Sequence, residues 1–197
     1  MRLSLCSRRH GMIRELLERA RCNADGVAAV EFAMIAPIMF FLFVGSVEFS
    51  QAITVDRRVT QVASSTADLI AREKSTTTTD VAGIMQIIDY LVRPYDSARL
   101  KVTVLNVKAN NNNAAVTTVC WSYNHNGGAN TYTDDQPYTL PAGLVEAGNS
   151  VIIAEASYDY QPLIFSYFIR AAFPLQEKFF LKPRLSSYVE YNGRNCP

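Results

Sequence analysis

The 197-residue sequence has few of the side chains from which most active sites are built. It contains only two histidines, His10 and His125, which are far apart in sequence and have no metal-ligand spacing around them. It has no glycine-rich phosphate-binding loop, and Ser46, Ser64 and Ser65 do not lie in a nucleophile elbow. We therefore expect a chain that is not an enzyme and that holds no cofactor and no metal.

The sequence also lacks a long continuous run of one charge after residue 26. The formal net charge is +1, and residues 27–197 contain no basic stripe, so nucleic-acid binding is not expected. Residues 1–26 are basic, because they carry six arginines against three acidic residues. Basic residues before an apolar span favour a cytoplasmic N-terminus. Arg57 and Arg58 oppose this orientation, although Asp56 lies beside them.

Cysteine is limited to four residues, divided by an apolar run. Cys6 and Cys22 precede the run, whereas Cys120 and Cys196 follow it. If the second pair is exported, it meets an oxidising compartment. This division predicts a disulfide between Cys120 and Cys196. Four unrelated thiols are the alternative.

One long apolar run dominates what the sequence does contain. It extends over the 21 residues from Val27 to Val47, and Glu31 is its only charged residue. A helix of that length spans about 30 Å, the thickness of the hydrocarbon layer of a bilayer. A carboxylate inside such a span costs about 2.5–3.5 kcal/mol on insertion scales, so it is usually paired. The run therefore predicts a membrane-spanning helix in contact with lipid, with one functional acid.

The residues of this run resemble a known family. The segment Glu31-Phe32-Ala33-Met34-Ile35-Ala36-Pro37 and a second acid–aromatic pair, Glu48-Phe49, resemble the TadE-like pseudopilins over about residues 26–72. These are minor pilin-like subunits of the tight-adherence (Flp pilus) machinery. The resemblance implies cleavage by a prepilin peptidase and a non-catalytic role in pilus assembly. It also implies contacts with other pilin or pseudopilin subunits and with an inner-membrane assembly platform.

Two positions carry the expected function. Gly26 precedes the predicted scissile bond, which would leave Val27 as the first residue; a helix-breaking glycine at the start of a span is the alternative. Glu31, followed by Phe32, lies four residues after Val27 and hence on the same helix face. Its carboxylate is then placed to neutralise the new α-amino group in its own chain or in a neighbouring chain. An acid satisfied by headgroups or water at the membrane interface is the alternative for Glu31.

The rest of the chain predicts an α+β fold, with a long membrane-spanning N-terminal helix followed by a small antiparallel-sheet exported domain, as in pilins. Hydrophobic spacing and turn residues predict a second helix over 81–92, capped by Asp80. They also predict strands over 100–108, 116–123, 151–160 and 179–191, with a long surface loop over 124–149. The expected domains are a leader (1–26), the membrane helix with its amphipathic continuation (27–74) and the exported domain (80–197).

Three functions compete at this stage. The first is a cleaved pseudopilin in the inner membrane, single-pass, with its C-terminal domain periplasmic or extracellular. The second is a binding or enzymatic domain released after an ordinary signal peptide, and the third is an uncleaved single-span membrane protein of unknown ligand. The N-terminal residue of the mature chain separates them, because they predict Val27, Ile53 and Met1 respectively.

Overall fold

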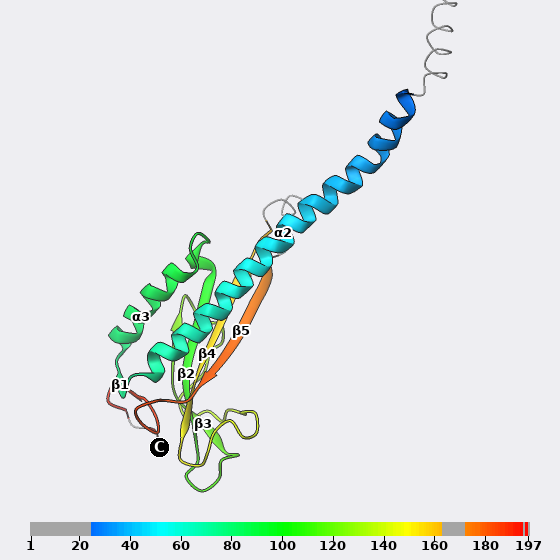
Figure 1. The fold of residues 1–197 in the computed structure, drawn as a ribbon. Coiled ribbons are helices and arrows are strands. Elements are labelled where there is room, and N and C mark those ends of the chain that lie inside the picture. Colours follow the sequence, from blue (N-terminus) through cyan, green and yellow to red (C-terminus); the bar gives the residue numbers. More distant parts are fainter. Residues whose placement is uncertain (1–24, 163–171, 195, 197) are drawn as a thin grey trace, which may run out of the picture. The chain divides into compact units, whose positions relative to one another are not determined.

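The structure is a computed structural model that describes residues 25–162, 172–194 and 196 (Figure 1). Most of the predicted leader, including Cys6 and Cys22, therefore lies outside the described residues. The chain divides into two compact units between Val47 and Glu48.

The described part of the first unit is the beginning of helix α2, which runs over Asp25–Ala71 and contains Pro37. Nearly every side chain from Gly26 to Phe43 is exposed, although the segment is almost entirely apolar. A helix satisfies its backbone hydrogen bonds internally, so this segment can be stable in lipid without a protein partner. The predicted long N-terminal helix is confirmed.

In the second unit, helix α2 becomes amphipathic. Its buried side chains recur at spacings of three and four residues and form one face of the core. From Val55 onward they are Val55, Val59, Val62, Ala63, Thr66, Ala67, Ile70 and Ala71. This periodicity explains why the helix continues as far as Ala71 after leaving the apolar run.

Helix α3 (Thr78–Leu91) follows α2, and its start corrects one prediction. The N-cap is Thr77, not Asp80. Asp80 occupies the third helical position, where its carboxylate accepts a hydrogen bond from the Thr77 backbone N–H at 3.0 Å. The Thr77 hydroxyl in turn accepts from the Asp80 N–H at 3.3 Å, which completes a capping box.

Four antiparallel strands form the main sheet in the order β3-β2-β4-β5. A short 3₁₀ helix, η1 (Ser97–Arg99), leads into it. The strands are β2 (Leu100–Ala109), β3 (Thr117–His125), β4 (Ser150–Tyr160) and β5 (Phe173–Leu181). Three of the four predicted strands agree with β2, β3 and β4 to within two residues, and the α+β class is confirmed.

The fourth strand was predicted at the wrong place. Strand β5 ends at Leu181, because Lys182 precedes Pro183, which has no N–H for a ladder. Residues Glu190–Tyr191 instead form strand β6, which pairs in parallel with β1 (Ser75–Thr76). The polar break between the two helices therefore contains a strand that local sequence signals did not indicate.

The two faces of the sheet are covered differently. Helices α2 and α3 lie on the same face (Figure 1), and their apolar side chains form the main core with Val102, Val104 and Ala154. The opposite face carries a smaller core that includes Leu105 and Ile153. The connection between β3 and β4, residues 126–149, covers this second core. It is thus a loop with a packing role.

Candidate assembly site on helix α2

Gly26 and Val27 lie in the first turn of the described helix. Gly26 is exposed, and a Cβ added to it would meet no atom within 4 Å. The bond between these two residues is therefore accessible within the described part of the chain.

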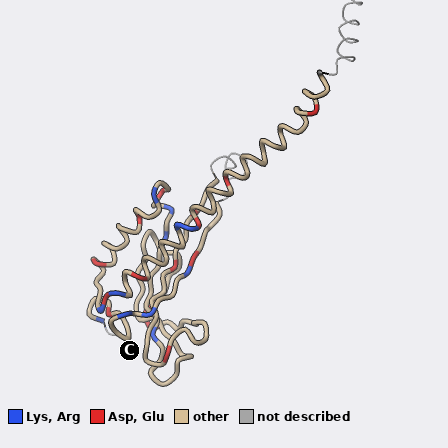
Figure 2. Tube along the Cα trace, in the orientation of Figure 1, with Lys and Arg blue, Asp and Glu red and all other residues tan. Residues whose placement is uncertain are grey.

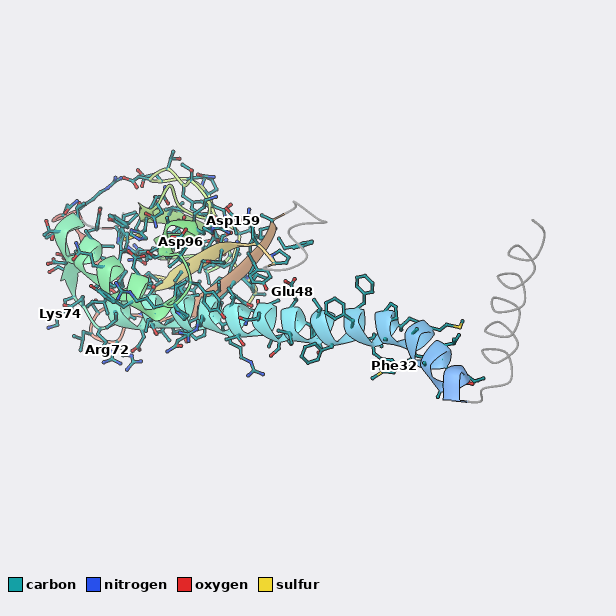
Figure 3. All side chains as sticks on the ribbon, turned by 90° about the horizontal axis from the view of Figure 1, so that it is seen from above. Phe32, Glu48, Arg72, Lys74, Asp96 and Asp159 are labelled. Atoms are coloured by element: carbon teal, nitrogen blue, oxygen red, sulfur yellow. A yellow bond between two sulfur atoms is a disulfide. The ribbon has the colours of Figure 1, made fainter. Side chains whose placement is uncertain are left out.

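Glu31 and Phe32 follow one turn later, and both are exposed. Figure 2 shows how few charges this part of α2 carries, and in Figure 3 the Phe32 side chain points away from the helix. Among the described residues, none forms a hydrogen bond or ion pair with the Glu31 carboxylate. An apolar helix thus presents one carboxylate that is available for a partner outside these residues.

The length and composition of α2 fit a single-pass membrane anchor. Among the described residues, one helix is long and apolar enough to cross a membrane; it is α2, with its candidate span over Gly26–Ala71. Glu48 and Phe49 follow the apolar run. Glu48 is buried in the second unit, where its backbone carbonyl accepts a hydrogen bond from the Tyr160 hydroxyl at 3.5 Å.

Cys120 and Cys196 belong to the second unit and form a disulfide with a Cα–Cα distance of 5.2 Å. The bond ties the chain end to strand β3. Next to it, the Trp121 Nε1–H and the Asn106 side-chain amide donate to the Val189 carbonyl at 2.8 and 3.1 Å. These contacts fasten residues 182–194, here called the C-terminal strap, across the end of the sheet.

The strap also reaches the end of α2. The Arg184 N–H donates to the Ala71 carbonyl at 2.9 Å, and its guanidinium pairs with Asp68. Tyr191 stacks on Trp121 with ring centroids 4.8 Å apart. The disulfide therefore closes a strap that connects α2, β1 and the sheet.

Sequence reasoning missed a polar cluster around a buried acid, on the sheet face opposite the helices. Glu155, in β4, is 1% exposed, and its carboxylate accepts a hydrogen bond from Lys178 Nζ at 2.6 Å. The Tyr132 and Tyr138 hydroxyls donate to it at 2.9 and 3.4 Å, and the Asn130 amide also donates to it. The available signal was an acid, Glu155, flanked on both sides by apolar and small residues in the strand over 151–160.

The cluster changes the protonation behaviour of its members. Burial, followed by the hydrogen bond and the charge of Glu155, raises the pKa of Tyr132 far above its usual range. Burial alone lowers the pKa of Lys178, but its hydrogen bond and attraction to Glu155 outweigh this effect and raise it. The loop 126–149 is therefore fixed to the sheet by a charged anchor as well as by apolar contacts.

The described residues contain no group of three or more His, Cys, Asp or Glu side chains that could hold a metal ion. His125, one of the two histidines, is engaged instead in a 3.0 Å contact between its Nε2 and the Asp89 carboxylate. This contact links β3 to α3.

The fold and the site thus define a class: a small α+β domain carried on one apolar, membrane-length helix. Residues 26–68 match the model of the family described as TadE-like protein. The match begins at Gly26, includes Glu31 and Phe32, and ends within α2, so it confirms the predicted resemblance for this segment. No curated protein and no solved structure was found to match the chain.

Proposed function

We propose that this protein is a minor pseudopilin that supports assembly of a tight-adherence pilus. It inserts with residues 1–26 in the cytoplasm, and a prepilin peptidase cuts after Gly26. The mature chain then begins at Val27, with the helix over 27–74 carrying an exported domain over 80–197. Its role is structural and involves other pilin or pseudopilin subunits and an inner-membrane platform.

The unpartnered carboxylate of Glu31 is the observation that carries this proposal. It lies in an apolar helix, within the segment that matches the TadE-like family, and four residues after Val27. Residues four apart share a helix face, so the α-amino group released by cleavage is placed to pair with this carboxylate or with that of a neighbouring chain. Such pairing would offset the cost of a charge in lipid.

The Cys120–Cys196 bond supports export of the C-terminal domain, because structural disulfides persist in oxidising compartments. The expected location is the inner membrane, with the domain on the periplasmic or extracellular side. Labelling of an engineered cysteine at exposed Asn112 by a membrane-impermeant maleimide checks this orientation. Labelling only after the membrane is broken would contradict it.

N-terminal sequencing of the membrane-associated protein tests the proposal directly. A chain beginning at Val27 supports prepilin processing. A chain beginning at Ile53 would indicate an ordinary signal peptide, and one beginning at Met1 would indicate an uncleaved anchor. Deleting the prepilin peptidase should leave the full-length chain, which serves as the matched control.

A further inference from the structure

A groove of about 560 Å³ lies between α3 and the segment 73–76, which contains β1. Glu73 and Asp80 give it an acidic part, together with the hydroxyl residues Ser75, Thr76 and Thr79. Gly83, Ile84 and Ile87 line its apolar part. Ile87 is 60% exposed, an unusual state for so apolar a side chain on a helix. This region, the α3 groove, combines an apolar part with an acidic part.

Gly83 has no role inside the fold that requires glycine. It lies in the middle of α3, and a Cβ built on it would meet no atom within 4 Å. Glycine in a helix interior costs about 0.5–1 kcal/mol relative to alanine. A missing side chain on an exposed helix face allows another backbone to approach closely, so this position points to a contact from outside.

The same chain exposes a complementary surface on α2. Phe49, Ile53 and Arg57 follow each other at four-residue spacing, and all three are exposed. These residues, the α2 stripe, place a positive charge after two apolar side chains. Within the described part of the chain, neither Arg57 nor Glu73 has a charged side-chain partner.

We propose that the α2 stripe of one copy docks in the α3 groove of a second copy, with Arg57 at the acidic part of the groove. This inference rests on the pilus-assembly function proposed above. Helices α2 and α3 run in opposite directions in one chain (Figure 1), so two copies of equal orientation bring α2 and α3 together antiparallel. Ile53 then lies beside Gly83 when Arg57 lies beside Asp80.

The contact requires the two copies to be displaced along the helix axis. In one chain, Arg58 Nη1 donates to the Leu91 carbonyl at 2.8 Å, so this part of α2 is level with the end of α3. Asp80 lies 11 residues before Leu91, which corresponds to about 16 Å of helix. Because the copies are displaced, the first contact uses the α2 stripe of one copy and the α3 groove of the other. The groove of the first copy and the stripe of the second stay free, so the same contact can be made with further copies.

Cysteine cross-linking of the full-length chain, in cells that produce the pilus, tests this contact. The chain carries Ile53→Cys and Gly83→Cys, and a short bis-maleimide joins nearby thiols. Within one chain these two positions are about 20 Å apart by helix rise, so a short linker does not bridge them. The expected product is a ladder of dimers, trimers and larger species. The matched control, Ile53→Cys with Asn112→Cys, should give no ladder.

Charge reversal adds a second measurement. Arg57→Glu or Glu73→Arg alone should lower the ladder yield roughly fivefold, the upper range for one exposed ion pair, and the two together should restore it. Dimers without larger species, an adduct with a different protein, or no ladder would overturn the contact. The N-terminal residue is sequenced in the same samples. Val27 without a ladder refutes only this contact, whereas an uncleaved Met1 in the unsubstituted chain refutes the proposed function.

Discussion

The Glu155 cluster gives a prediction whose size follows from the structure. Removing its carboxylate should destabilise the domain more than removing its cation. Glu155→Leu takes the acceptor from Tyr132, Tyr138 and Asn130, whereas Lys178→Met leaves those three donors in place.

The burial of each side chain sets the size of the expected stability losses. Glu155 is 1% exposed, but the Lys178 side chain is 49% exposed, so solvent screens the ion pair and its contribution is at most about 1 kcal/mol. A fully buried donor left without an acceptor costs about 1–3 kcal/mol. Tyr132 and Tyr138 are half-buried and Asn130 is exposed, so each of these donors costs about 1 kcal/mol, the low end of that range. We therefore expect a loss of about 3 kcal/mol for Glu155→Leu and about 1 kcal/mol for Lys178→Met. At 2–4 °C per kcal/mol for a unit of this size, the first variant should melt roughly 6–12 °C lower.

The assay is urea unfolding of the detergent-solubilised full-length chain, followed by the fluorescence of Trp121, the only tryptophan. Equal stability of Glu155→Leu and the unsubstituted chain would refute the reasoning. It would show that apolar packing compensates for the whole polar cluster, as happens in some proteins with buried ion pairs. Lys178→Met as the more damaging change would also contradict it.

The dependence of the free energy of unfolding on alkaline pH tests the same cluster independently. The pKa of Tyr132 and that of Lys178 are both raised in the folded chain, so both hold their protons after the unfolded chain has released them. The unfolded state then binds fewer protons, and the free energy of unfolding should fall as pH rises above about 10. Tyr132→Phe should reduce this slope, whereas an unchanged slope would exclude Tyr132 as its source.

Three further predictions concern the candidate site and the strap. Gly26→Arg should block processing, whereas Gly26→Ala should permit it; the size and the N-terminal residue of the membrane-bound product measure this. Normal maturation of the arginine variant would reject Gly26 as the cleavage site. Glu31→Val should insert but fail to support piliation, because the amino group of Val27 loses its counter-charge; normal pilus counts by electron microscopy would reduce Glu31 to an interfacial acid. Cys196→Ser should lower the free energy of unfolding by up to about 4 kcal/mol, the loop-entropy value for a sequence separation of 76 residues, and should make the C-terminal strap sensitive to protease. No change in either measurement would show that the strap stays in place without the Cys120–Cys196 disulfide.

The elements that depend on local signals could be predicted from the sequence. The apolar run from Val27 to Val47 and the spacing of buried residues after it predict one long helix, because helix periodicity is a local property. Strands β2, β3 and β4 follow from short runs of β-preferring residues between turn signals. The four cysteines, divided by the apolar run, similarly favoured the Cys120–Cys196 pair that the structure contains.

Other features depend on chain segments far apart in sequence, and only the tertiary structure decided them. Strand β6 forms because residues 190–191 meet β1, which lies more than 110 positions earlier in the chain. The segment 124–149 was predicted as a surface loop, because its anchor, Glu155, lies on another strand. The α3 groove likewise exists only once α3 packs on the sheet and turns Gly83 and Ile87 outward. Short-range propensity determines which segments become helices and strands, whereas burial and pairing between distant segments determine where those segments end and which side chains meet.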